Sequence, residues 1–174
     1  MGKLNITRDQ CNIFPGGWSI KPEEMYTALS SVEYTDVLRI LEFGAGDGTR
    51  ALVKLLTDTG VGFEYTSYEN DALFAVMDPR VHTVMWRDMP TKLEQGIFDL
   101  VIIDGPMGLD RCKWYPLVAP MTHKGTIIVV DDYHHFTEFK VALDKHFTHD
   151  VIQEHLEAPI PGAGQVSWVV TRVI

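Results

Sequence analysis

A chain of 174 residues, 45% of them hydrophobic, is long enough for one globular domain with its own core. A net charge of −9 argues against nonspecific binding to nucleic acid, whose phosphates require a positive surface. No apolar run approaches the ~20 residues of a membrane span, and two cysteines form neither a disulfide framework nor a metal pattern. We therefore expect a single cytoplasmic domain over residues 1–174, without a nucleic-acid or membrane partner.

The pattern of apolar residues predicts strands that alternate with helices. Residues 1–21 show no assignable periodicity, and Pro22 marks the start of a helix because proline suits the first helical position. The elements predicted after it are strand Val37–Phe43, helix Thr49–Thr59, strand Phe63–Tyr68, helix Asp71–Met77, strand Val81–Trp86, helix or turn Thr91–Gln95, strand Phe98–Ile103, helix Leu109–Met121 broken at Pro116, strand Thr126–Val130, helix Thr137–Phe147, and strands Asp150–Leu156 and Gln165–Val173.

Strands that alternate with helices indicate a doubly wound α/β sheet. Residues 101–103 and 127–130 are apolar without interruption, which is typical of central parallel strands covered on both faces. The last two strands have no helix between them and should form an antiparallel hairpin.

A glycine-rich stretch, Glu42–Thr49, lies between the first central strand and the helix that follows it. Gly44, Gly46 and Gly48 would let a ligand approach the backbone, and the free N–H groups of the helix point to the same place. We interpret this stretch as the floor of a nucleoside-cofactor pocket. The dinucleotide pattern G-x-G-x-x-G requires a third glycine where this chain has Thr49, which disfavours NAD.

The form E-x-G-x-G-x-G, beginning at Glu42, resembles motif I of class I S-adenosylmethionine-dependent methyltransferases, and the likeness extends from Pro22 onward. It implies a Rossmann-like seven-stranded sheet, mostly parallel with the C-terminal antiparallel hairpin. Glu69, at a strand end about 20 residues on, suits the ribose hydroxyls. The resemblance also implies that Asp88 accepts from the adenine amino group. The candidate cofactor-binding residues are Glu42, Gly44, Ala45, Gly46, Asp47, Gly48, Glu69, Asn70, Asp88 and Asp104.

Three carboxylates, Asp104, Asp131 and Asp132, follow the ends of two central strands. The ligand crevice of such a sheet lies beyond the carboxyl ends of its strands, so these acids should converge there. Clustered acids repel each other unless they hold a cation, share a proton or face solvent. Their oxygens suit Mg²⁺, which would bind a substrate hydroxyl and lower its pKa. Asp131 could instead cap the turn that follows it.

The segment Val130–Tyr133, with its following helix, resembles metal-dependent O-methyltransferases of the catechol and caffeoyl type, and more closely those that act on macrolide and aminocoumarin sugars. The resemblance implies that Asp104, Asp131 and Asp132 are metal ligands. Pro106 replaces a second acid found in the sugar enzymes, so we predict His134 or His135 as the general base. The chain is short for this group, and Phe14–Ile20 is the predicted substrate lid, within residues 1–21.

The expected function is methyl transfer from S-adenosylmethionine to a hydroxyl of a small molecule or sugar, assisted by Mg²⁺. Three alternatives stay open: a metal-independent methyltransferase acting on nitrogen or a carboxylate, a cofactor-binding protein without transferase activity, and an NAD-linked oxidoreductase. Arg111 and Lys113 are expected near the rim of the crevice as solvated surface charges, with contact to an anionic substrate as the alternative. The sequence sets neither the acceptor nor the oligomeric state.

Overall fold

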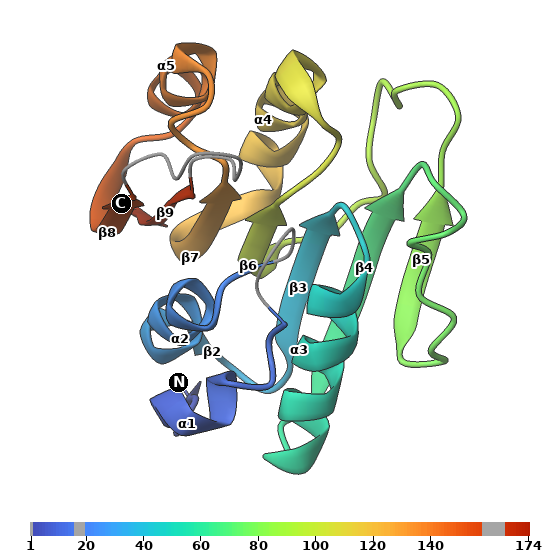
Figure 1. Cartoon of the computed structure of the whole chain (residues 1–174), viewed down its shortest axis with the longest axis vertical. Helices are drawn as coiled ribbons and strands as arrows, with labels where there is room; N and C mark the ends of the chain where they lie inside the picture. The colour runs from blue at the N-terminus through green and yellow to red at the C-terminus, as the bar shows by residue number, and fades with distance from the viewer. Residues whose placement is uncertain (1, 16–19, 158–165) are drawn as a thin grey trace.

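The computed structural model describes residues 2–15, 20–157 and 166–174. In this part of the chain, seven strands form one sheet in the spatial order β5-β4-β3-β6-β7-β9-β8 (Figure 1). The first five run parallel, and β9 lies antiparallel to both of its neighbours, β7 and β8. This confirms the predicted fold class. The strands are β3 (Leu38–Phe43), β4 (Phe63–Glu69), β5 (Val81–Met85), β6 (Phe98–Ile103), β7 (Thr122–Asp131), β8 (His149–Leu156) and β9 (Ser167–Val173).

Helices cover both faces of this sheet and enclose two apolar cores. On one face lie α1 (Arg8–Cys11), α2 (Pro22–Ser31) and α3 (Asp47–Asp58); α2 and α3 stand in front of the sheet in Figure 1. The other face is covered by η1 (Gly108–Lys113), α4 (Trp114–Val118), η2 (Ala119–Met121) and α5 (Thr137–His146). A separate ladder joins β1 (Gly2–Lys3) to β2 (Glu33–Tyr34). In the described ranges, each helix is too short or too polar to cross a bilayer.

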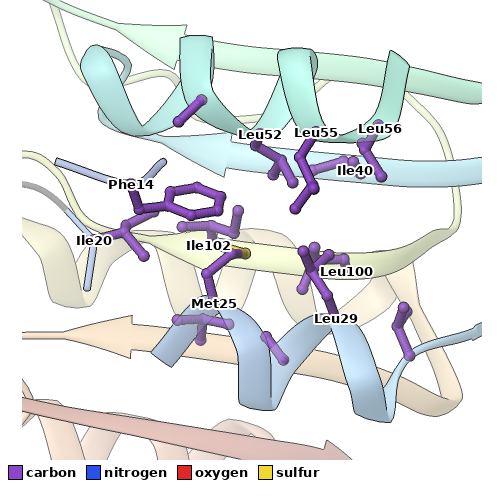
Figure 2. Close-up of a cluster of buried hydrophobic side chains, with 14 of the residues drawn as sticks. Phe14, Ile20, Met25, Leu29, Ile40, Leu52, Leu55, Leu56, Leu100 and Ile102 are labelled. Atoms are coloured by element: carbon purple, nitrogen blue, oxygen red, sulfur yellow. The ribbon is translucent and has the colours of Figure 1, made fainter. Parts of the chain in front are cut away.

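The N-terminal segment forms part of the first core (Figure 2). Phe14 and Ile20 are 3% and 1% exposed, and both belong to the core that α2 and α3 form against the sheet. Burying each such side chain contributes about 1.5–3 kcal/mol. The ends of the predicted lid, Phe14–Ile20, are therefore packed inside. Residues 16–19 lie outside the described residues, and the lid itself stays a prediction.

The predicted helix Asp71–Met77 is wrong. The chain forms a turn there, in which the Asp71 carboxylate accepts from the N–H of Leu73 at 2.9 Å and the Asp71 carbonyl accepts from Phe74. Such local side-chain bonds compete with helix formation. Leu73 and Met77 are 84% and 92% exposed, so their side chains make no core contacts that would stabilise a helix. At 91–95, where a helix or turn was predicted, the chain bends at 91–92 and forms no helix, so no helix joins β4 to β5 or β5 to β6.

The predicted helix Leu109–Met121 is divided into η1, α4 and η2, and the breaks do not fall at Pro116. Pro116 is the third residue of α4. Its missing N–H costs little there, because the first N–H groups of a helix have no partner within the helix. Trp114, in the same segment, stacks on Phe43 with ring centroids 4.1 Å apart and links this segment to the end of β3.

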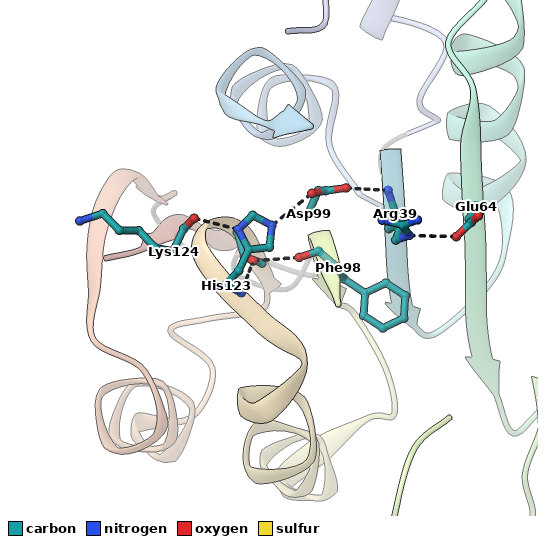
Figure 3. Close-up of polar contacts among 7 residues, drawn as sticks. Arg39, Glu64, Phe98, Asp99, His123 and Lys124 are labelled. Atoms are coloured by element: carbon teal, nitrogen blue, oxygen red, sulfur yellow. Dashed lines mark hydrogen bonds and ion pairs between the residues drawn. The ribbon is translucent and has the colours of Figure 1, made fainter. Parts of the chain in front are cut away.

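Polar contacts connect the strands at the end of the sheet opposite the carboxyl ends of β3 and β6 (Figure 3). Asp99 accepts from the backbone N–H of Arg39 at 2.8 Å and lies 3.1 Å from His123 Nε2. Arg39 in turn donates to Glu64 at 3.0 Å. Asp99 thereby links the amino ends of β3 and β6 to the start of β7.

Candidate cofactor-binding site

The backbone at the end of β3 touches the backbone at the end of β6. Gly44 has a φ of +94°, and a Cβ placed on it would lie 2.6 Å from the backbone nitrogen of Gly105. A Cβ on Gly105 would lie 2.8 Å from the Cα of Gly44. The carbonyl of Phe43 accepts from the N–H groups of Asp104 and Gly105, at 2.9 and 2.6 Å. Only glycine at both positions permits this approach.

Glu42 supports the glycine-rich loop from beneath. It is 1% exposed, and its Oε2 accepts from the hydroxyls of Thr49 at 2.7 Å and Ser67 at 3.1 Å. Thr49 Oγ1 in turn accepts from the N–H of Gly46 at 3.0 Å. Burial raises the pKa of Glu42 to about 7. The predicted contact of Glu42 with the cofactor stays a prediction; in the structure this residue holds the loop.

Glu69 fixes the same loop from the end of β4. Its Oε2 accepts from the N–H of Ala45 at 2.7 Å, and its Oε1 accepts from the N–H groups of Asn70 and Asp71, also at 2.7 Å. A carboxylate offers about four acceptor positions, so these three bonds leave one for a ligand. Glu69 is 5% exposed. Its predicted role toward the ribose is not tested by the structure.

A pocket of about 570 Å³ opens beside these loops, within the size range of small-molecule sites. Aromatic side chains from four positions contribute to its wall, which is lined by Gly44, Ala45, Tyr68, Glu69, Asn70, Asp71, Ala72, Phe74, Trp86, Asp104, Gly105, Pro106, Met107 and Trp114. Five predicted cofactor residues therefore line one pocket: Gly44, Ala45, Glu69, Asn70 and Asp104.

The other predicted cofactor residues lie outside this lining. Gly46 and Gly48 lie in the loop and the first turn of α3, and Gly46 has open space where a Cβ would be. Asp47 is exposed and pairs with Arg50 at 2.9 Å. Asp88 is also exposed, beyond the end of β5. Their roles stay predictions.

Two of the three strand-end aspartates face each other. Asp104 and Asp131 share a hydrogen bond between their carboxyl groups, which requires a proton between them. Burial raises the pKa of both groups, and the charges around each raise it further, Asp131 acting on Asp104 and Asp132 on Asp131. Asp104 lines the pocket, whereas Asp131 is only 5% exposed behind it.

Glu24 of α2 lies close enough for the charges of Asp131 and Asp104 to act on it, and the sequence analysis did not single it out. It is fully buried, and burial followed by the charge of Asp131 raises its pKa well above the usual range. One oxygen accepts from the N–H of Lys21 at 3.2 Å, and Oε1 has no hydrogen-bond partner. No local sequence signal distinguishes Glu24 from the neighbouring Glu23.

The expectation that Arg111 is a solvated charge is wrong. Arg111 is 2% exposed, because η1 packs it between the ends of β6 and β7. Its guanidinium donates to the backbone carbonyls of Asp131 at 2.6 Å, Pro106 at 3.2 Å and Asp104. It therefore fixes the two strand ends relative to each other. Lys113, in contrast, is exposed and pairs with Asp110 at 2.6 Å.

Asp132 does not join Asp104 and Asp131. Its φ of +56° turns it out of the strand, and its carboxylate lies 3.5 Å from Arg111 and 2.9 Å from His135 Nδ1. Among the described residues, no three His, Cys, Asp or Glu side chains form a group that could hold a metal. The predicted ligands Asp104, Asp131 and Asp132 thus do not fit a shared ion in this arrangement.

The two predicted bases are held away from the cofactor pocket. His134 Nε2 lies 2.7 Å from Glu154 on β8, and its backbone N–H donates to Ser167 on β9 at 2.9 Å. His135 pairs with Asp132 as described above. Neither histidine lines the pocket, and their catalytic role stays a prediction.

No protein-family model and no curated protein matches this sequence. Solved structures do match. The cofactor-bound protein Rv0187 from MTB is 17% identical, with 99% of this chain and 83% of that chain covered and a TM-score of 0.60. An S-adenosylmethionine-dependent methyltransferase from Mesorhizobium loti is 15% identical, with 87% and 96% covered and a TM-score of 0.57.

A protein from Thermoplasma acidophilum, provisionally named a methyltransferase, is 17% identical, with 86% and 74% covered and a TM-score of 0.58. The chain spans only 46–62% of four other structures that it matches. At these identities the likeness establishes the fold alone. The chain has the Rossmann-like fold of class I S-adenosylmethionine-dependent methyltransferases.

Proposed function

We propose that the chain binds S-adenosylmethionine in the pocket beside Gly44 and Glu69 and transfers its methyl group to a small-molecule hydroxyl. The observation that carries this proposal is Glu69, which lines the pocket while its carboxylate anchors the glycine-rich loop. One acceptor position on Glu69 is left for a ribose hydroxyl. The fold likeness supports the same ligand.

The residues present fit this cofactor. Gly44 and Ala45 bring the backbone to the pocket wall, and Trp86 and Phe74 offer aromatic surface for a purine. When bound, S-adenosylmethionine supplies a methyl group on a positively charged sulfur. The protein then has to orient the acceptor and remove the proton of its hydroxyl.

Asp104 is the residue best placed to receive that proton. It lines the pocket, whereas His134 and His135 do not. Its carboxyl group shares one proton with Asp131, so the pair keeps one negative charge with which it can take up the proton of the acceptor. Arg111 fixes the backbone of both aspartates and so keeps the pair in place.

Calorimetric titration with S-adenosylhomocysteine, the demethylated form of the cofactor, tests this proposal. Glu69→Gln should weaken binding by about tenfold or more, because it removes a charged acceptor from the ligand and the loop. Glu64→Gln is the matched control, since Glu64 lies on the same strand but is exposed and pairs with Arg39. Equal affinities of wild type and Glu69→Gln, in folded proteins, would contradict the proposal.

The sequence also predicted that Mg²⁺ assists the methyl transfer, and the arrangement of the described carboxylates does not support this. Asp132 contacts Arg111 and His135 rather than Asp104. This observation favours the metal-independent alternative, in which the acceptor is a nitrogen, a carboxylate or an unassisted hydroxyl. Methyl transfer measured after exhaustive treatment with EDTA, with and without added Mg²⁺, separates the two. Activity that EDTA removes and Mg²⁺ restores would refute the metal-independent reading.

A further inference from the structure

The loop that follows β6 presents an apolar side chain at the cofactor pocket. Met107 lines this pocket and is 84% exposed, so it gains little from packing within the protein. Asp104, the proposed proton acceptor, precedes it in the same loop and lines the same pocket. Met107 therefore lies next to the place where the methyl acceptor has to react.

The backbone of this loop is fixed by two buried side chains. Arg111 donates to the carbonyl of Pro106 at 3.2 Å and to that of Asp104, and Trp114 Nε1 donates to the carbonyl of Gly105 at 3.0 Å. Three consecutive carbonyls are thus held by η1 and α4. A side chain on such a loop is presented in a defined position, which strengthens its contact with a ligand.

Exposed apolar side chains are concentrated in two segments that contribute to the pocket lining. Of the fourteen large apolar side chains that are exposed in the described ranges, five lie at 73–77 and 107–109: Leu73, Phe74, Met77, Met107 and Leu109. Single exposed apolar residues are ordinary at a protein surface, whereas a group of them beside a pocket indicates a binding surface.

The sheet order places these two segments at different ends of the pocket. Phe74 and Trp86 follow β4 and β5, whereas Met107 follows β6, which lies on the other side of β3. The proposed position of the purine against Phe74 and Trp86 directs the methyl end of the cofactor toward β6 and Asp104. The acceptor then meets Met107 rather than Phe74.

The pocket lining also indicates the charge of the acceptor. It contains the carboxylates of Glu69, Asp71 and Asp104, and its described residues include no lysine, arginine or histidine. An anionic acceptor would be repelled there and would find no cation, because a charge taken from water requires a partner of opposite sign.

We propose that the methyl acceptor is a neutral molecule with an apolar body beside its reacting hydroxyl, and that Met107 is the specificity-determining residue that contacts this body. This inference rests on the proposed function, because it places the acceptor against the cofactor pocket. The methionine side chain is flexible and polarizable, so it packs against flat and irregular apolar surfaces alike.

The test measures binding to the complex with S-adenosylhomocysteine by calorimetry, with 4-ethylphenol, 4-butylphenol and the anionic 3-(4-hydroxyphenyl)propanoate as probes. Wild type should bind 4-butylphenol about tenfold more tightly than 4-ethylphenol, because each buried methylene strengthens binding by roughly fourfold and part of the chain stays in water. The propanoate should bind more weakly than 4-butylphenol.

Met107→Gln keeps the length of the side chain but makes its end polar, and it should reduce the ratio of the two alkylphenol affinities to about threefold or less. Met107→Leu should keep the ratio, because its side chain stays apolar. Met85→Gln is the matched control and should behave as wild type, since Met85 is 48% exposed at the end of β5 and lies outside the pocket lining.

The inference would be overturned by equal binding of the two alkylphenols to wild type, by an unchanged ratio in Met107→Gln, by an equal loss in Met85→Gln, or by tighter binding of the propanoate. A dimer in sedimentation experiments that Met107→Gln dissociates would also overturn it, because a second copy of the chain would then cover this loop. Failure of S-adenosylhomocysteine to bind would count against the proposed function. Cofactor binding without a preference for the longer chain would count against the apolar acceptor alone.

Discussion

Glu42 makes the stability of the protein depend on pH in a defined direction. Its carboxyl group is 1% exposed beneath the glycine-rich loop, and burial raises its pKa to about 7 from an ordinary value near 4.5. A carboxyl group whose pKa is higher in the folded state favours folding while it is protonated. Its contribution is complete below about pH 4.5 and is lost as the pH rises through about 7.

The magnitude follows from the two pKa values. One pKa unit corresponds to about 1.36 kcal/mol, so ionising Glu42 at about pH 8 should cost the folded state roughly 3 kcal/mol. Glu42→Gln replaces the carboxyl group with a neutral one of the same shape, and its oxygen can still accept from Thr49 and Ser67. We expect the variant to gain stability relative to wild type as the pH rises from about 5 to about 8, by roughly 2–3 kcal/mol.

Urea unfolding followed by circular dichroism at a series of pH values measures this difference directly. Taking the difference between variant and wild type cancels the contribution of the Glu24 and Asp131 carboxyl groups, which are common to both, and leaves the Glu42 carboxyl group together with the effect of its charge on Asp104. Glu64→Gln on β4 is the control, because Glu64 is exposed and should give a nearly constant difference. If the Glu42→Gln difference were also constant across this range, the argument that Glu42 is buried with a raised pKa would fail.

Two further predictions concern the backbone around the site. Gly44→Ala should destabilise the protein by about 2 kcal/mol or more in urea unfolding, because its Cβ would meet Gly105 at 2.6 Å; Gly60→Ala, at a φ of +71° with open space, should cost only about 1 kcal/mol. Arg111→Met should destabilise by about 2–4 kcal/mol, because three carbonyls lose their donor, while Lys113→Met should be nearly neutral. Equal costs within either pair would contradict the structural reasons given.

The sequence was informative where a local pattern dictates a local structure. A strand that ends in glycines and is followed by a helix predicted the loop between β3 and α3 that contains Gly44, and Glu69 was predicted at the end of the next strand; both line the pocket, while their roles toward a cofactor stay predictions. Uninterrupted apolar runs identified β6 and β7 as central strands. In each case a few neighbouring residues were sufficient for the prediction, because residues that follow parallel strands lie at the same edge of the sheet.

It was uninformative where burial depends on distant parts of the chain. Arg and Glu are residue types that usually lie at the surface, and Arg111 and Glu24 are buried only because η1 and α2 pack onto the sheet. Asp131 and Asp132 look equivalent in the sequence, but the positive φ of Asp132 directs the second acid toward Arg111 and His135. The positive φ of Asp132 therefore gives the side chains of Asp131 and Asp132 different surroundings, although the two residues are identical in type and adjacent in sequence.

Gly44 and Gly105 lie 61 positions apart in the sequence, yet neither can be replaced by a larger residue unless the backbone around the other one also changes. A side chain at either one pushes against the backbone of the other. A cofactor loop transplanted from another protein would therefore need the matching segment after β6, and an exchange of either segment alone would misplace both. Recombination between related chains with a breakpoint between Gly44 and Gly105 would be penalised unless the incoming segment brought the matching glycine. The pair thus joins the end of β3 and the end of β6 into a unit that has to be inherited or engineered together.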